Sequence, residues 1–556
     1  MVKKKFLIQS FIISRKFCLI LGRNKKVGIG RKEEREKKMG QGKGGDHPLK
    51  NLLRRLNNQK IPLNKKIDRT RDAIINFCKE NGINSLYVNN DIMQTVIESR
   101  NKKVLSGRDL WRNIQQECEF WLRIPFCHTI QINIDCNKSE NRAKEMCYFT
   151  IGSKRRIGVK PMIFKHDESR TPPGPILITD DSIPDRDSWK RMKMNPTLRK
   201  QINWYVAKKF CTEISIGNKI KGLKTVIIDN CVNDQYLFHQ DKKTTPYFRL
   251  VISYLDGKRH SIKKIKATGI SEGELAMSYS TKEVKISPLT QKPENIILLT
   301  ADQDIVPIEL ANSKTRFFVD PDTKKKVWKN RVFVCMPKRK KITKTQWERS
   351  YLLIDMNLMY ERIIETYSRK FPSISNPIES ELFLWYLGGC DTNDKPFHGV
   401  GYQKFIYKTW EENITEYGKM ISMIEGQSIE LSNGVIFNGE LPLVDLKLYR
   451  KFAKRVFRTK LESFKTAKTK KKWKKAFSKQ CGDSLYIIPR QIMFQIYWIT
   501  NIPKIRFEQD VVPVLSPFTK GSDGESLWGY ELVNAENCHC NPVCGSAKSV
   551  SSDFQI

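Results

Sequence analysis

The N-terminal half of the chain carries short apolar runs that end in polar or acidic residues. Ile296 to Leu299 is continuously apolar, which is typical of a strand buried on both faces. Segments with helical spacing of apolar residues lie between such runs, and this alternation predicts a parallel α/β sheet. Further strands are predicted at Leu86 to Val88, His128 to Ile134, Thr225 to Ile228, Tyr247 to Tyr254 and Val327 to Met336, and helices at Asp72 to Glu80, Leu105 to Leu122 and Leu275 to Thr281.

The C-terminal half has a different pattern, in which apolar residues recur at helical spacing. Helices are predicted from Leu352 and from Glu379, and the second ends at Gly388-Gly389. A charge-rich stretch near residues 137–217, broken by Pro172-Pro173-Gly174-Pro175, is predicted to be an insertion. The chain thus divides into a basic, disordered extension (1–48), an α/β domain with the insertion (49–345), a helical region (346–500) and a tail (501–556).

The charge of the chain indicates an anionic partner. Its 100 Lys and Arg residues against 59 Asp and Glu give a formal net charge of +41, which favours nucleic acid. The 14 cysteines are scattered along the sequence, which favours reduced thiols and an intracellular protein. With nucleic acid as the partner, a nuclear location is expected.

The N-terminal extension contains two apolar pieces that are too short to span a membrane. Phe6 to Ile13 and Phe17 to Leu21 are separated by Ser14-Arg15-Lys16, so no membrane segment is predicted, and a secretory signal is the alternative. Met39-Gly40 forms a second plausible start of the protein.

The segment from Lys447 to Lys479 is the most basic part of the chain. It holds 15 Lys and Arg residues with aromatic residues between them. A solvated basic helix, a phosphate-contacting face and a nuclear import signal are all compatible with this pattern.

Four carboxylates stand in two short clusters of this basic chain. Asp302 and Asp304 directly follow the strand Ile296 to Leu299, and Glu272 and Glu274 stand at the head of a predicted helix. Grouped carboxylates repel one another unless a cation compensates them, and ligands of open α/β sheets bind beyond the carboxyl ends of the strands. The clusters indicate a divalent-metal site, although helix N-termini also favour Glu for their own reasons.

The order of motifs resembles that of the flap endonuclease (XPG-like) family, whose catalytic domain has a PIN-like fold. In that family an acid ends an early strand, Glu-x-Glu opens a helix, Asp-x-Asp ends the next strand, and Gly-Cys-Asp precedes Gly-x-Gly. The matching pieces here are IQINID, SEGELA, TADQD, Gly389-Cys390-Asp391 and Gly399-Val400-Gly401. IPDRDSW, PRQIMFQIYW and LWGY are similar to the divergent branch found in large DNA viruses.

The resemblance implies a fold, a metal site and a nucleic-acid surface. The fold is a central parallel sheet flanked by helices and followed by a helical, helix-hairpin-like DNA-binding region. Two Mg²⁺ or Mn²⁺ ions would be held by Asp135, Glu272, Glu274, Asp302, Asp304 and Asp391, with Asp91 as a further candidate. Arg142, Lys144, Arg155 and Arg156 would be the catalytic basic residues, and Gly399, Gly401, Lys454, Arg455, Arg458, Lys471 and Lys472 would bind nucleic acid.

Two kinds of function follow from these residues. The first is a metal-dependent, structure-specific nuclease that hydrolyses DNA flaps or 5′ ends in replication, repair or recombination, or RNA in a variant of the same chemistry. The second is a nucleic-acid-binding protein of the same fold without turnover, because Asn89 stands where the family's first acid is expected. Asp229, which also ends a predicted strand, is an alternative to Asp135 as the early acid.

Overall fold

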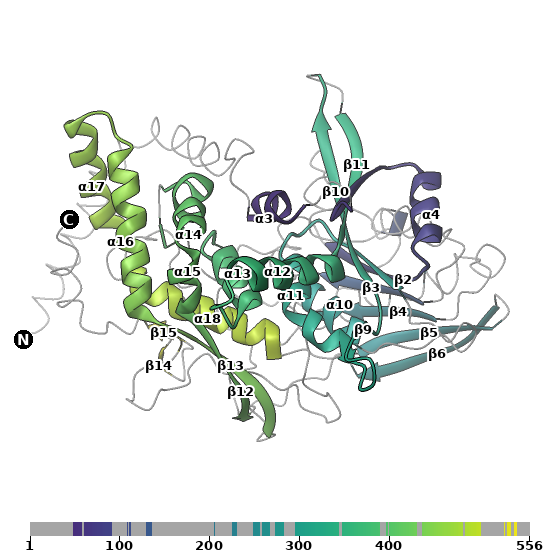
Figure 1. The fold of residues 1–556 in the computed structure, drawn as a ribbon. Helices are drawn as coiled ribbons and strands as arrows, with labels where there is room; N and C mark the ends of the chain where they lie inside the picture. Colours follow the sequence, from purple (N-terminus) through teal and green to yellow (C-terminus); the bar gives the residue numbers. More distant parts are fainter. Residues whose placement is uncertain are drawn as a thin grey trace, which may run out of the picture.

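The main sheet of the computed structural model contains nine strands among the described residues (Figure 1). The structure describes residues 48–57, 61–91, 129–135, 225–230, 248–255, 258–266, 273–282, 295–343, 347–389, 400–430, 436–481, 484–501, 531–534 and 539–541, with a few isolated positions elsewhere. The strands are β1 (Asn64–Asp68), β2 (Ile83–Asp91), β3 (Thr129–Asp135), β4 (Thr225–Asn230), β5 (Phe248–Leu255), β6 (Lys258–Lys266), β7 (Asn295–Leu299), β10 (Val332–Lys341) and β11 (Trp347–Asp355).

The centre of the sheet is parallel and its two sides are antiparallel. The spatial order is β1-β11-β10-β7-β2-β3-β4-β5-β6, and each neighbouring pair from β10 to β4 is parallel. The pairs at the two sides are antiparallel. The predicted α/β class with a parallel central sheet is confirmed, with antiparallel strands added on both sides.

The strand order reverses between β2 and β7. Starting from β2, the chain adds β3 and β4 on one side and later adds β7 and β10 on the other side. Such a reversal is the topological switch point of a doubly wound sheet.

Helices cover both faces of this sheet (Figure 1). On one face lie α10 (Gly273–Lys282), α11 (Ile305–Asn312) and α12 (Met356–Lys370), whose buried residues share a core with Leu298 and Val334. On the other face lies α4 (Arg71–Glu80), where the Phe77 ring packs edge-to-face on Phe333 with 5.3 Å between centroids. Neighbouring residues of β10 therefore face opposite helical layers, as the pleat of a strand requires.

The remaining described elements form a mainly helical part beside the sheet. Its main elements are α3 (Pro48–Leu56), α13 (Pro377–Tyr386), the π-helix η4 (Tyr402–Tyr407), α14 (Lys408–Glu412), α15 (Ile414–Tyr417), α16 (Leu446–Glu462), α17 (Ala467–Cys481), α18 (Ser484–Asn501) and the hairpin of β12 (Ile421–Glu430) and β13 (Ile436–Val444). Two short strands, β14 (Glu531–Asn534) and β15 (His539–Asn541), pair with each other near the C-terminus. No described helix has the length and apolar character needed to cross a bilayer.

The predicted single strand from Val327 to Met336 is wrong, because the chain forms two strands there. β9 (Lys326–Trp328) pairs with β8 (Phe317–Val319), and β10 begins only at Val332. Between them the Lys329 amide donates to the Arg316 carbonyl at 2.8 Å, and Asn330 Nδ2 donates to the Thr281 carbonyl at 3.1 Å. These contacts with distant residues turn the chain at Lys329-Asn330-Arg331, three consecutive polar residues that the predicted strand had included.

The predicted helix from Leu352 is also corrected. Leu352 to Asp355 belong to β11, where Leu352 pairs with Met336, and α12 starts at Met356. Asp355 caps that helix by accepting from the Leu358 amide at 3.0 Å. Sheet pairing has overridden a helical spacing of apolar residues. The predicted helix from Leu105 to Leu122 and the predicted insertion lie outside the described residues, apart from isolated positions.

Candidate functional site

The carboxyl ends of β7, β2 and β3 lie side by side at one edge of the sheet. Val88 of β2 is in register with Leu299 of β7, and Asp91 is in register with Asp135 of β3. Directly after Leu299 the chain continues into the segment Thr300 to Asp304, which leads into α11. In doubly wound sheets ligands bind at this place, beyond the strand ends at the switch point.

Glu274 reaches the same edge from the first turn of α10. Its side chain is 5 % exposed, and its Oε1 accepts a hydrogen bond from Thr300 Oγ1 at 3.1 Å. The same hydroxyl oxygen accepts from the Asp302 amide at 3.1 Å. Thr300 therefore ties Glu274 to the segment that carries Asp302.

The two aspartates after Thr300 differ in their surroundings. Asp302 is exposed, and its Oδ1 accepts from the Asp304 amide at 3.0 Å. Asp304 occupies the N-cap position of α11 but makes no side-chain capping hydrogen bond. Asp304 therefore does not act as a hydrogen-bonding cap, and the dipole of α11 is what favours a carboxylate at this position.

The buried carboxylate of Glu274 requires electrostatic compensation. Moving a carboxylate out of water is costly unless donors or positive charge replace the lost hydration. The Thr300 hydroxyl supplies one donor, and the N-terminus of α10 supplies partial positive charge. A divalent cation would supply more, and the oxygen-only donors Glu274, Asp302 and Asp304 suit a hard ion such as Mg²⁺ or Mn²⁺.

The remaining predicted metal ligands are placed only in part. Asp91 and Asp135 are located by the backbone of β2 and β3, while Glu272 and Asp391 lie outside the described residues. Among the side chains that the structure describes, no three carboxylate, histidine or cysteine groups converge on one point. The described part thus brings Glu274, Asp302 and Asp304 into one neighbourhood without a closed ligand set.

The register also bears on Asn89 and on Asp229. Asn89 of β2 pairs with Asn133 of β3, and Asn133 pairs in turn with Asp229 of β4. Asp229 therefore lies one strand farther from the switch point than Asp135 does. This position favours Asp135 as the acid of the site.

The predicted phosphate-contacting residues are mostly outside the described part. Arg142, Lys144, Arg155, Arg156 and Gly399 are not among the described residues. Gly401 precedes η4 with a φ of −67°, which any residue can adopt, so its backbone does not require glycine.

The sequence did not predict a projecting arm formed by β10 and β11. Cys335 of β10 pairs with the last residue of β7, yet β10 continues from Met336 to Lys341, about 20 Å farther at the usual rise of a strand. Figure 1 shows this hairpin standing away from the sheet. The basic residues from Lys338 to Lys341 therefore form the end of an arm beside the acidic edge.

The composition of this arm suits contact with a polyanion. β10 ends in Lys338-Arg339-Lys340-Lys341, and Ile342 near the tip is 56 % exposed. Lys338 is half-buried, and this burial lowers its pKa. A signal was present in the sequence, because strand-like text on both sides of the basic run is typical of a hairpin.

α16 carries a second basic surface. Its buried stripe is Tyr449, Phe452, Ala453, Val456 and Phe457, while Lys454, Arg455 and Arg458 are exposed on the other side. In α17, Lys471 and Lys472 are exposed as well, and the Trp473 ring lies 5.7 Å from that of Phe464. The aromatic residues between the charges thus belong largely to the core, and the charges form a solvated face.

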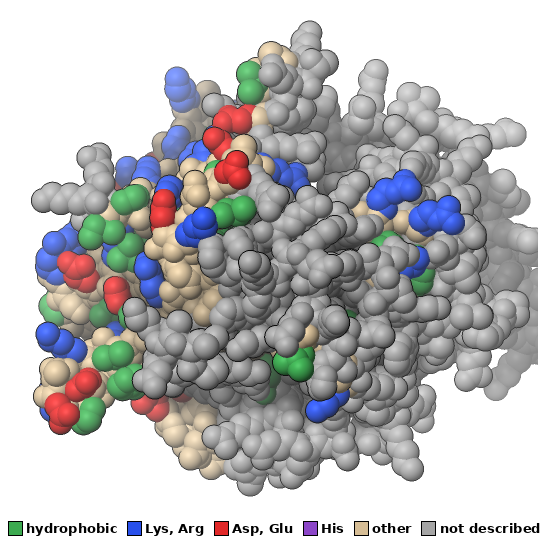
Figure 2. Space-filling view, turned by 90° about the vertical axis from the view of Figure 1, so that its right-hand side faces the viewer, with side chains coloured by type: hydrophobic (Ala, Val, Ile, Leu, Met, Phe, Trp, Pro, Cys, Tyr) green, Lys and Arg blue, Asp and Glu red, His purple; other side chains and the backbone are tan. Residues whose placement is uncertain are grey.

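The face of the molecule drawn in Figure 2 carries charges of both signs, unlike the exposed side of α16. Figure 2 shows described Lys and Arg side chains on that face lying among Asp, Glu and hydrophobic side chains. The exposed side of α16 from Lys451 to Arg458 carries Lys and Arg without an acid between them.

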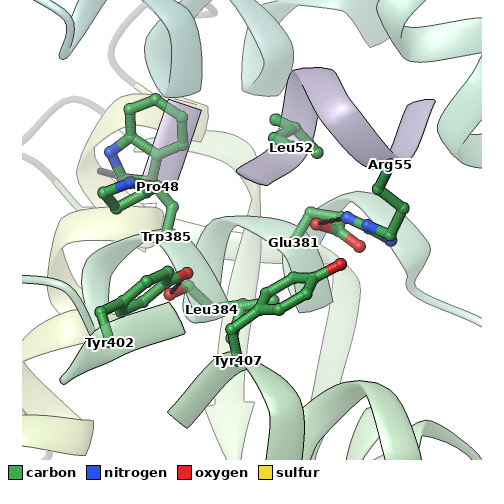
Figure 3. Close-up of a pocket in the computed structure, with 8 residues that line it drawn as sticks. All are labelled: Pro48, Leu52, Arg55, Glu381, Leu384, Trp385, Tyr402 and Tyr407. Carbon is green, nitrogen blue, oxygen red and sulfur yellow. Dashed lines mark hydrogen bonds and ion pairs between the residues drawn. The ribbon is translucent and has the colours of Figure 1, made fainter. Parts of the chain in front are cut away.

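A pocket lies where α3 meets α13 and η4 (Figure 3). The Arg55 guanidinium forms an ion pair with Glu381, whose Oε1 accepts from the Tyr367 hydroxyl at 2.6 Å. Because the carboxylate neutralises the guanidinium, the pocket has no net charge that would attract a phosphate or a cation. The lining residues are Pro48, Leu52, Arg55, Glu381, Leu384, Trp385, Tyr402 and Tyr407.

The tyrosines of this pocket are held in their neutral form. Burial raises the pKa of Tyr407 to about 12, and the Tyr402 hydroxyl donates to the Leu384 carbonyl at 2.9 Å. These contacts join α3 to α13 and η4.

No protein-family model matches this chain, and no curated protein sequence matches it either.

Proposed function

We propose that the protein is a metal-dependent nuclease of the flap endonuclease type, with a PIN-like α/β domain that hydrolyses phosphodiester bonds in DNA. One observation carries the proposal: acidic residues reach the switch-point edge of the sheet from four separate elements. These are β2 with Asp91, β3 with Asp135, α10 with Glu274, and the segment after β7 with Asp302 and Asp304.

The acidic edge would hold Mg²⁺ or Mn²⁺ through carboxylate oxygens. Such ions make a bound water nucleophilic near neutral pH and stabilise the leaving oxygen. The chain's own contribution is to position the ligands: Thr300 orients Glu274, and the short segment from β7 to α11 fixes Asp302 beside it. Glu272 and Asp391 are the further ligands that the family resemblance implies.

Nucleic acid would reach this edge along the basic surfaces next to it. The arm of β10 and β11 rises from the strand beside β7, so its Lys and Arg residues follow the acidic edge directly. Phosphate contacts by Lys and Arg position a duplex without reading its sequence, which suits an enzyme that recognises structure. We propose DNA as the partner, in the nucleus, with RNA as the variant.

A binding protein without turnover is the second candidate, and Asn89 is the observation that favours it. Asn89 follows Val88, the residue paired with the end of β7, so it lies next to the acidic segment. An amide oxygen can ligate a cation but contributes no negative charge. With Asn89 in this position, the site would bind metal more weakly than a site with an acid there.

Metal-dependent cleavage decides between the two candidates. The full-length protein is incubated with an end-labelled 5′-flap duplex in Mg²⁺, in Mn²⁺ and in chelator, and a matched RNA flap is run beside it. We expect products in either metal and none in chelator, with binding retained in chelator. Binding without any cleavage in both metals would instead support the second candidate.

The basic face of α16 is expected to contribute to DNA affinity. The triple change Lys454→Gln, Arg455→Gln, Arg458→Gln leaves the buried stripe intact but removes three charges. The slope of log Kobs against log salt should become shallower by up to about 2.7, with affinity lowered about tenfold or more.

A matched control uses exposed cations on other elements. Lys79→Gln, Arg369→Gln, Lys370→Gln removes the same charge from α4 and α12. Equal losses in the two triple variants, measured by fluorescence anisotropy across a salt series, would mean that only the net charge of the chain matters.

A further inference from the structure

The hairpin of β8 and β9 lies at the edge of the sheet opposite to the acidic residues. It directly precedes β10, whose first residue, Val332, pairs with Ile296 near the start of β7. Figure 1 shows β9 on the side of the sheet away from the arm of β10 and β11. Whatever binds this hairpin therefore approaches a different end of the molecule from the proposed site.

This small hairpin exposes three large hydrophobic side chains. Phe318, Val319 and Val327 are 48 %, 55 % and 38 % exposed, and Phe318 pairs across the hairpin with Val327. They are three of the seven exposed large hydrophobic residues in the described part of the chain. Phe318 and Val327 lie on one face of the hairpin, whereas Val319 pairs with Lys326 and lies on the other face. A single exposed hydrophobic residue is ordinary, but the patch that Phe318 and Val327 form together indicates an interaction surface.

The hairpin is held firmly, so these side chains cannot turn into the core. The opposite face packs inward, where the Lys326 ammonium lies 4.1 Å from the Phe317 ring centroid and 4.7 Å from that of Tyr360. Trp328 packs edge-to-face on Phe317 at 5.3 Å and donates through its indole N–H to Glu361.

The turn of the hairpin is fixed as well. Asp320 Oδ1 accepts from the amides of Asp322 at 2.9 Å and Thr323 at 2.8 Å. A patch presented on a rigid element loses little conformational entropy when a partner binds.

The charge around the patch defines the partner. Lys324 and Lys325 are exposed beside it, and the hairpin with its flanks carries five basic residues, Lys324, Lys325, Lys326, Lys329 and Arg331, against two acidic ones, Asp320 and Asp322. A second copy of the chain is disfavoured because each copy has a net charge of +41. Phe318 is the one ring of the patch on which a base could stack and Val327 offers none, so the apolar pair favours protein over nucleic acid.

We propose that the β8–β9 hairpin docks a partner protein through an extended segment that combines apolar with acidic side chains. The apolar side chains cover Phe318 and Val327, and the acidic ones lie against Lys324 and Lys325. This proposal is independent of the nuclease activity, because the two surfaces lie at opposite edges of the sheet.

The test uses a defined peptide as the probe. The peptide contains nine Glu and three Leu residues, and the Leu residues stand at alternate positions. In one control peptide Ser replaces Leu, and in the other Lys replaces Glu. Binding to the full-length protein is measured by fluorescence anisotropy for the wild type, the double variant Phe318→Ser, Val327→Thr, and a control variant. The control is Ile424→Ser, which changes a residue of β12 that is 40 % exposed.

We expect the wild type to bind the Glu–Leu peptide at least about tenfold more tightly than either control peptide. The Phe318→Ser, Val327→Thr variant should lose this preference, while Ile424→Ser should keep it and both should cleave DNA like the wild type. Equal binding of the Glu–Ser peptide would reduce the site to charge alone and overturn the proposal. A loss of oligonucleotide affinity in the Phe318→Ser, Val327→Thr variant would also overturn the proposal. So would a concentration-dependent dimer of the wild type that this variant does not form.

Discussion

Replacing both Asp302 and Asp304 by Asn should lower metal-dependent DNA cleavage on the order of a thousandfold. Asn keeps the size of the side chain and one oxygen but removes the charge that holds a divalent cation. The Asp302 Oδ1 that accepts from the Asp304 amide at 3.0 Å is retained as an amide oxygen, so the segment keeps its conformation. DNA affinity, measured in chelator, should stay within about twofold of the wild type because the basic surfaces are unchanged.

The chain offers a matched control with the same spacing of acids. Asp320→Asn, Asp322→Asn changes an Asp-x-Asp pair in the turn of the β8–β9 hairpin, at the opposite edge of the sheet. Single-turnover cleavage by this control should equal that of the wild type. If both double variants cleaved like the wild type in Mg²⁺, the acidic edge would not be the site of hydrolysis.

Removing one partner of the Glu309–Arg316 ion pair should destabilise the fold by about 3–5 kcal/mol. Both side chains are 0 % exposed, and Arg316 Nη1 lies 2.6 Å from Glu309 Oε2. Burial lowers the pKa of Arg316, and the neighbouring Glu309 carboxylate opposes that shift. Arg316→Met or Glu309→Leu alone would leave the other charge in the core without compensation.

A double-mutant cycle separates the pair from its surroundings. Glu309→Leu, Arg316→Met removes both charges, and most of the loss seen in each single variant should be recovered. Arg331→Met, which breaks a pair with Asp355 at a side chain that is 48 % exposed, should cost less than about 1 kcal/mol. Urea unfolding followed by circular dichroism measures each free energy of unfolding, and additive losses in the double variant would contradict a coupled buried pair.

Local patterns in the sequence predicted the centre of the sheet well. β7 spans Asn295–Leu299 where a continuous apolar run indicated a buried strand, and α4 spans Arg71–Glu80 where a helix was predicted from Asp72. The acidic segment after β7 was found by the same logic, because the strand ends where its apolar residues end. Its connection to Glu274 through Thr300 was visible only in the structure, because Glu274 belongs to a helix and not to a strand of the sheet.

Patterns failed where a contact with distant residues decides the conformation. Leu352 has helical apolar neighbours, yet its pairing with Met336 makes it part of β11. The break between β9 and β10 depends on hydrogen bonds from Lys329 to Arg316 and from Asn330 to Thr281. The spacing of apolar residues indicates which side chains avoid water, but it does not indicate which backbone groups form hydrogen bonds with one another.

The sequence by itself determined the α/β class, the basic character of the chain and the identity of the acidic residues. Only the tertiary structure decided that Thr300 joins Glu274 to Asp302, that β10 and β11 project as an arm beside them, and that Phe318 and Val327 share an exposed face. The physical reason is that composition and periodicity are properties of one segment, whereas register and strand order depend on the pairing of segments far apart in the chain.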